Sequence, residues 1–206
     1  MKLMALIVIE GLDGSGKGTQ AKLLYDYALS RGRARQVTFP DYDSPSSSLV
    51  KMYLKGDFGK EAGDVNAYAA SAFYAVDRFA SYRMKWKDDY ASGVPIISDR
   101  IVYQLSKLPK TEWKAFVSWL EDLEYEKFGL PRPDRVIYLD VPPKISQRLL
   151  TERYAGDTTK KDIHESDIHY LLHCRDCALY AAEHLNWTVL NCAEGDTLRS
   201  IEDIHH

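Results

Sequence analysis

The 206-residue sequence predicts an α/β fold of three layers, α/β/α, around a mostly parallel sheet of five strands. Short apolar runs alternate with longer helical stretches, an order typical of parallel sheets with helices on both faces. The first run, residues 3–9, is apolar without interruption, as expected for a strand that is covered on both sides. The sequence shows no internal repeat and no interdomain linker, so we expect a single domain over residues 1–206.

Proline and glycine mark several boundaries of the expected elements. Pro40 ends a short strand, Pro45 suits the first turn of a helix, and Gly93 ends a long helical stretch. The polar, charged residues 154–162 favour a mobile loop, and we expect a lid over about 153–163. The expected strands are 3–9, 37–39, 94–98, 135–141 and 187–190, and the longer helices are about 65–90, 111–127 and 164–184, with one more that begins at Pro142–Pro143.

A glycine-rich loop joins the first strand to the first helix. It contains Gly11, Asp13, Gly14, Ser15, Gly16, Lys17, Gly18 and Thr19. The order strand, GxxxxGK, helix is that of the P-loop, in which backbone N–H groups and the helix N-terminus hold phosphate. Lys17 would reach the outer phosphates of a bound nucleotide, so we expect a fold like that of P-loop nucleoside triphosphate hydrolases. A merely flexible turn would leave the agreement of strand, loop and helix unexplained.

Composition limits the partners and the compartment. The formal net charge of -3 argues against a dedicated nucleic-acid binder, which is normally basic. The sequence has no apolar run of membrane-spanning length, and its N-terminal segment is typical of a strand rather than a signal peptide. Three cysteines do not make a disulfide framework. We therefore expect a cytoplasmic protein with no nucleic-acid or membrane partner.

Cys174 and Cys177 form a CxxC pair, which raises the question of a redox or zinc site. They lie inside an expected helix and no second CxxC exists, so structural cysteines are favoured. His169 and His173 lack the glutamate of a metalloprotease helix and are expected to be ordinary surface residues.

Polar residues follow two other expected strands. Asp99 and Arg100 come directly after residues 94–98, and Phe39 lies at the end of its own strand. Because ligands bind beyond the carboxyl ends of parallel strands, these residues join the P-loop in one candidate site. Asp99 is expected to hold Mg²⁺, directly or through water, and Arg100 to bind a phosphate. The structural alternative is a local ion pair between the two.

Tyr74 and Arg78 lie four residues apart in the long helical stretch and so share a face. A ring with a guanidinium beyond it could stack on a base and bond its edge. The spacing alone favours the structural alternative, a buried ring beside an arginine whose charged end reaches solvent.

Together these residues resemble the thymidylate kinases, a family of nucleoside monophosphate kinases. The resemblance covers nearly the whole chain, in order, and rests on the P-loop with its Asp13, the helix segment 73–78, the DR motif at 98–100, the YQ pair at 103–104, the turn 129–134 and the lid residues 162–165. It implies an enzyme that moves the γ-phosphoryl group of ATP to dTMP, giving dTDP and ADP, with Mg²⁺ as cofactor.

The resemblance also implies roles at matching positions, and it assigns the acceptor to Asp13, Phe39, Tyr74, Arg78, Arg100 and Gln104. Asp13 would bond the sugar 3′-hydroxyl, which favours a deoxynucleotide. Tyr74 would stack on thymine, Arg78 would bond its carbonyl group, and Gln104 would contact the base. Arg100 would contact the acceptor phosphate region.

The family places either a P-loop arginine or basic lid residues on the transferring phosphoryl group. The P-loop of this chain carries no arginine, so the lid is expected to supply that charge. Arg153, at the hinge of the lid, is the first choice as a catalytic residue, and Arg148 on the same helix is expected to contact ATP. Lys160 and Lys161 are further candidates. For any one of the four, a solvated position at a helix end is the alternative.

Three departures, one from the common P-loop motif and two from the family pattern, keep other functions open. Gly18 stands where Ser or Thr usually offers a hydroxyl to magnesium. Tyr42 follows Phe39–Asp41 in a segment where members often carry an arginine, and only two residues separate Arg100 from Tyr103. The acceptor could therefore be dUMP or another deoxynucleoside monophosphate, or the protein could bind nucleotide yet be catalytically weak. Intact Lys17, Asp99 and Arg100 argue against the last alternative.

The family is commonly homodimeric, and the resemblance implies a homodimer here. The aromatic-rich stretch from Tyr68 to Trp86 could contribute to such a surface.

Overall fold

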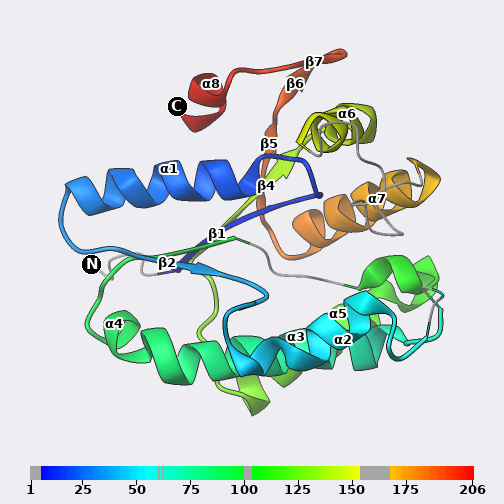
Figure 1. Ribbon diagram of the computed structural model, residues 1–206, viewed down its shortest axis with the longest axis horizontal. Coiled ribbons are helices and arrows are strands. Elements are labelled where there is room, and N and C mark those ends of the chain that lie inside the picture. The colour runs from blue at the N-terminus through cyan, green and yellow to red at the C-terminus, as the bar shows by residue number, and fades with distance from the viewer. Residues whose placement is uncertain (1–5, 60, 62, 100–103, 154–167) are drawn as a thin grey trace.

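One five-stranded parallel sheet forms the centre of the computed structural model, which describes residues 6–59, 61, 63–99, 104–153 and 168–206 (Figure 1). The strands are β1 (Leu6–Gly11), β2 (Arg35–Thr38), β3 (Ile96–Asp99), β4 (Arg135–Asp140) and β5 (Thr188–Asn191). Their order across the sheet is β2-β3-β1-β4-β5, and every pairing is parallel. The predicted fold class is confirmed.

Helices cover both faces of this sheet, as Figure 1 shows. One layer contains α1 (Lys17–Ser30), α6 (Pro143–Arg153) and α8 (Ile201–His205). The other contains η1 (Pro45–Ser47), α2 (Ser48–Lys55), α3 (Ala67–Ser81), η2 (Tyr82–Trp86), α4 (Lys87–Ala91), η3 (Leu105–Lys107), α5 (Lys110–Glu121), η4 (Asp122–Lys127) and α7 (Ile168–His184). Within these described ranges, no helix combines the length and the apolar character needed to cross a lipid bilayer.

Alternation along the strands divides the core between the two layers. Val8 and Ile96 face the layer of α3 and pack in one cluster with Trp86. Ile9 and Ile97 face α1 and pack with Ala21. Burying each such side chain contributes about 1.5–3 kcal/mol, so the apolar strands hold both layers in place.

The structure adds detail that the sequence pattern did not reveal. The long stretch expected at 65–90 is not one regular helix, because the wider π-helical segment η2 separates α3 from α4. Near the C-terminus, β6 (Ala193–Glu194) and β7 (Thr197–Leu198) pair in an antiparallel hairpin that was not predicted. Two-residue strands are too short to show an alternating pattern.

Two predicted features fall wholly or mostly outside the described residues. These are the lid, expected at about 153–163, and the DR loop from Arg100 to Tyr103. The lid and the DR loop therefore stay predictions. The described neighbours are α6 and α7 on either side of the lid, and β3 and η3 on either side of the DR loop.

Candidate functional site

The glycine-rich loop has the backbone of a phosphate-binding turn. Gly14 and Gly16 both adopt φ of 80°, in the left-handed region that favours glycine. A Cβ atom on Gly14 would lie 2.6 Å from the carbonyl oxygen of Ser146 on α6, so a side chain has no room there. Gly16 caps α1, and the first turn of that helix contains no acidic residue. The positive end of the helix dipole is therefore not neutralised by its own first turn.

Lys17 is the first residue of α1 and folds back over the loop. Its Nζ atom donates to Oδ1 of Asp13 at 3.0 Å and to the carbonyl oxygen of Leu12 at 3.3 Å. The Lys17 side chain is 12% exposed and that of Asp13 is 41% exposed. The predicted phosphate-binding cation and the predicted sugar-binding carboxylate thus lie in contact within the loop.

Asp99 ends β3 on the same side of the sheet as α1, because it pairs in register with Ile9. A Cβ atom on Gly18 would lie 3.8 Å from Oδ2 of Asp99. The other carboxylate oxygen of Asp99 is buried and has no hydrogen-bond partner among the described residues. A buried carboxylate oxygen that lacks a donor suits a hard cation such as Mg²⁺. Asp99 thus stands beside the position where the common P-loop carries a hydroxyl.

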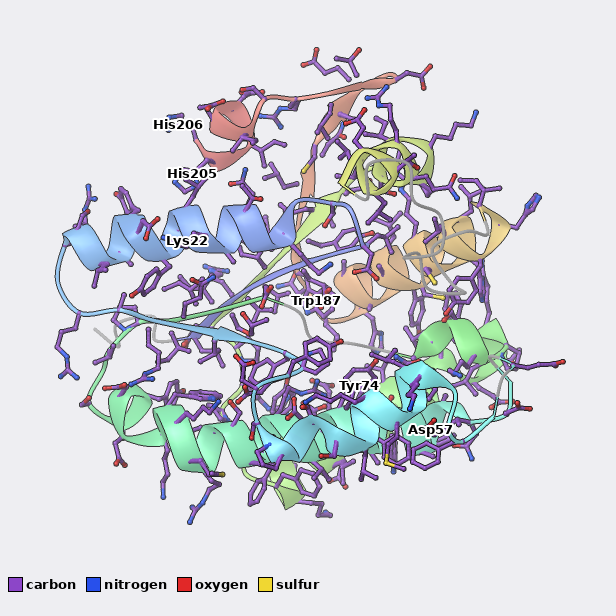
Figure 2. The ribbon with its side chains drawn as sticks, in the orientation of Figure 1. Lys22, Asp57, Tyr74, Trp187, His205 and His206 are labelled. Carbon is purple, nitrogen blue, oxygen red and sulfur yellow. The ribbon has the colours of Figure 1, made fainter. Side chains whose placement is uncertain are left out.

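The α3 helix carries the predicted base-binding pair on the opposite side of the sheet from α1. Figure 2 shows Tyr74 in this layer and Lys22 of α1 across the sheet. Tyr74 is buried and meets the ring of Tyr53 edge to face, with centroids 6.5 Å apart. Nζ of Lys107 lies 5.2 Å from the Tyr53 centroid. Burial lowers the pKa of Lys107, and the charge of Asp64 opposes that shift.

Arg78 is buried rather than at the helix surface. Its Nε donates to Oε2 of Glu124 at 3.1 Å, and its Nη2 donates to Oε1 of the same carboxylate. The alternative in which the charged end of Arg78 reaches solvent is therefore wrong, because the side chain is only 5% exposed and its guanidinium forms an internal ion pair. Its role toward a base stays a prediction.

The segment after β2 is tied to the layer of α3. Phe39 is buried at its start. Asp77 of α3 accepts hydrogen bonds from the backbone N–H of Asp41 at 2.8 Å and from the Ser46 hydroxyl. The carboxylate of Asp41 also forms an ion pair with Lys85. Asp41, paired with Lys85, and Tyr42 thus occupy the segment where members of the family often carry an arginine.

The comparisons with known proteins agree with this geometry. A model of the family described as thymidylate kinase matches residues 9–205 of the chain. The chain belongs to the thymidylate kinase family.

The relatives come from distant organisms. A probable thymidylate kinase of Thermococcus kodakarensis is 34% identical over 154 residues, which is 71% of this chain and 71% of that protein. A thymidylate kinase of Caenorhabditis elegans is 32% identical over 156 residues, and the match spans 68% of this chain and 65% of the worm protein. A thymidylate kinase of Plasmodium falciparum is 27% identical over 205 residues, and the match spans 97% of this chain and 85% of that protein.

A solved thymidylate kinase structure from Candida albicans has the same fold. The TM-score is 0.70 at 21% identity, with 98% of this chain and 87% of that chain covered. The predicted family and enzyme class, a nucleoside monophosphate kinase, are confirmed by these comparisons.

For several residues that the family resemblance singled out, the structure gives only a position in the fold, and others lie outside the described residues. Arg148 lies exposed on α6, and Arg153 is the last residue of that helix. Gln104 is half-buried directly before η3. Arg100, Lys160 and Lys161 lie outside the described residues. The roles of all these residues stay predictions.

The cysteine pair lies within α7, as expected, and its thiols are free. Burial raises the pKa of Cys174, and burial raises that of Cys177 to about 12. Thiols of this kind remain protonated at neutral pH and are poor nucleophiles and metal ligands. His169 is exposed, as expected. His173 is half-buried instead, with its ring 6.0 Å from that of Trp113.

Two residues that contact the predicted base-binding pair were missed in the sequence. Tyr53 lies on α2, in a segment with no motif, and only the fold brings it to Tyr74. Glu124 lies in an acidic run that resembles a solvated helix face. Only its burial, 3% exposed, distinguishes it from the neighbouring acids.

Proposed function

We propose that this member of the thymidylate kinase family transfers the γ-phosphoryl group of ATP to dTMP. The observation that carries the proposal is the juxtaposition at one end of α1. Lys17 begins the helix, Gly14 and Gly16 open the loop for phosphate, and Asp99 stands beside Gly18. Phosphoryl transfer depends on positioning and on charge neutralisation, and this edge of the sheet offers both.

The donor would lie on the P-loop. Backbone N–H groups from Gly14 to Thr19 and the N-terminus of α1 would hold its phosphates. Lys17 would exchange its contact with Asp13 for the outer phosphates. Mg²⁺ would be held by Asp99, directly or through water, and would supply neutralising charge to the phosphate oxygens.

The acceptor would lie between the loop and α3. Asp13, released by Lys17, would accept a hydrogen bond from the sugar 3′-hydroxyl and so select a deoxynucleotide. The Tyr74 ring would pack on the base, and Arg78 would donate to a base carbonyl group. Gln104 and Phe39 would complete the base site.

The positive charge that stabilises the migrating phosphoryl group would come from residues near the lid and the DR loop. We assign this role first to Arg153, which ends α6, with Arg148 directed to ATP and Arg100 to the acceptor phosphate. A lid that closes over both substrates would exclude water and prevent loss of ATP to hydrolysis.

We also propose that the chain forms a homodimer in the cytoplasm. Large apolar side chains of the predicted stretch lie exposed on one layer, with Val76 at 42%, Phe79 at 38% and Met84 at 74%. Exposed apolar surface of this extent favours a second copy as its cover. Free thiols at Cys174, Cys177 and Cys192 suit a reducing compartment.

A comparison of acceptors tests the proposed function. With ATP and Mg²⁺, we expect ADP release to require a monophosphate, and kcat/KM to be at least about tenfold higher for dTMP than for dCMP, because Arg78 can only donate hydrogen bonds. The closest competitor is dUMP, since it differs from dTMP by one methyl group, which is worth about tenfold in an apolar pocket. A preference for dUMP or dCMP over dTMP would show that another kinase activity is correct. Turnover at background level would favour a nucleotide-binding protein without catalysis.

A further inference from the structure

We propose that Glu124 is a positioning residue for the acceptor site. Its carboxylate would hold the guanidinium of Arg78 in one orientation, so that Arg78 presents hydrogen-bond donors to the edge of the base. Glu124 would then determine discrimination between bases with a carbonyl group at that edge and bases with an amino group. This inference rests on the proposed function, because it requires the acceptor base to bind next to Arg78.

The contact between the two side chains is bidentate and internal. Nε and Nη2 of Arg78 bond to different oxygens of the same carboxylate. The side chains are 5% and 4% exposed. Two parallel bonds fix the plane of a guanidinium as well as its position, which a single contact does not do.

The backbone of Glu124 is fixed independently of this pair. Glu124 lies in η4, a π-helical segment at the end of α5. Its carbonyl oxygen accepts a hydrogen bond from the N–H of Leu130 at 2.9 Å, and so anchors the turn that leads into β4. Beside it, the rings of Phe79 and Phe128 pack 5.5 Å apart and join α3 to the same turn. The backbone that carries the carboxylate is therefore held in place by a hydrogen bond and by packed rings.

Glu124 differs from the other acids of its segment. Glu121 and Glu126 pair with Arg132 at the surface, where Arg132 also lies over the ring of Tyr125. Glu124 alone among these three glutamates points inward, toward α3. Burial and the Glu124 charge both raise the pKa of the Tyr125 hydroxyl, which keeps that neighbour neutral.

Stability alone is a weak explanation for such a pair. Removing two charges from water has an energetic penalty that often equals their attraction, so apolar residues of similar size hold a core equally well. Orientation is a better explanation, because a guanidinium carries donors only. Held in one plane, it favours the carbonyl edge of thymine or uracil over the amino edge of cytosine.

The test replaces Glu124 by glutamine, which keeps the size and removes the charge. For Glu124→Gln we expect KM for dTMP to rise about tenfold and the dTMP-to-dCMP ratio of kcat/KM to fall by a similar factor. KM for ATP is expected to change less than about twofold, because the P-loop lies across the sheet. The matched control is Glu121→Gln, which removes an acid of the adjacent surface pair and should leave all three values unchanged.

A merely structural role gives a different result. It would reduce the folded fraction, and therefore kcat, while KM for dTMP and the base ratio stayed at wild-type values; that outcome overturns the inference. Should Glu124→Gln not fold, Glu124→Asp keeps the buried pair neutral overall but moves the carboxylate by one methylene group. We expect it to raise KM for dTMP about threefold, and unchanged values would again overturn the inference. If the wild-type protein uses no pyrimidine monophosphate at all, the proposed function fails first, and this assignment fails with it.

Discussion

Replacement of Lys17 by alanine is expected to lower kcat for phosphoryl transfer by about 10³-fold. The lysine lies at the N-terminus of α1 with its amine in contact with Asp13, at the mouth of the phosphate loop. Without it, no described cation of the loop remains to neutralise the outer phosphates. The measurement is ADP release under saturating ATP and dTMP.

The control for this variant is Lys22→Ala. Lys22 lies on the same helix, but it is exposed and pairs with Asp26 at the surface. Its loss is expected to change kcat less than about twofold, because exposed pairs contribute little. A Lys17→Ala protein with more than a tenth of wild-type kcat would contradict the role given to this residue.

The second large effect is expected for Gly14→Ala, and it concerns stability as well as nucleotide binding. Gly14 has φ of 80°, and a Cβ atom there would lie 2.6 Å from the backbone oxygen of Ser146 and 3.0 Å from Leu150. Alanine must therefore adopt the left-handed conformation, which destabilises the protein by about 1–2 kcal/mol. It must also displace α6, which adds about 1–3 kcal/mol. We expect a loss of about 3 kcal/mol in the free energy of unfolding, measured by urea denaturation, and loss of ATP binding.

Gly16→Ala separates the two causes. Gly16 has the same φ of 80°, but a Cβ atom there would meet nothing within 4 Å. Only the conformational penalty of about 1–2 kcal/mol is expected for it. Equal losses for the two variants would show that α6 does not press on the loop in the way the structure indicates.

The sequence predicted the fold where local patterns are strong. The apolar run before Gly11 and the alternation of strands and helices suffice to predict a parallel sheet, because the spacing of apolar residues within each segment indicates a strand or a helix. The hairpin β6–β7 and the π-helical segments η2 and η4 were missed, since two-residue strands and one-turn changes of helix pitch leave no periodic signal.

In the candidate site, too, contiguous motifs could be predicted and contacts between distant residues could not. The P-loop is contiguous, so its residues could be named from the motif, and their backbone shape agrees with it. The proximity of Asp99 to Gly18 joins positions 81 residues apart and could only be expected from the common edge of the sheet. The partner of Arg78 could not be expected at all, because an acidic run does not reveal which glutamate turns inward.

Transfer of label from γ-labelled ATP tests the central claim most directly. With dTMP and Mg²⁺ present, we expect the label to appear in dTDP, at a rate that depends on Lys17 and Asp99. Label that appears only in inorganic phosphate, or that remains in ATP while dTMP is bound, would contradict the account.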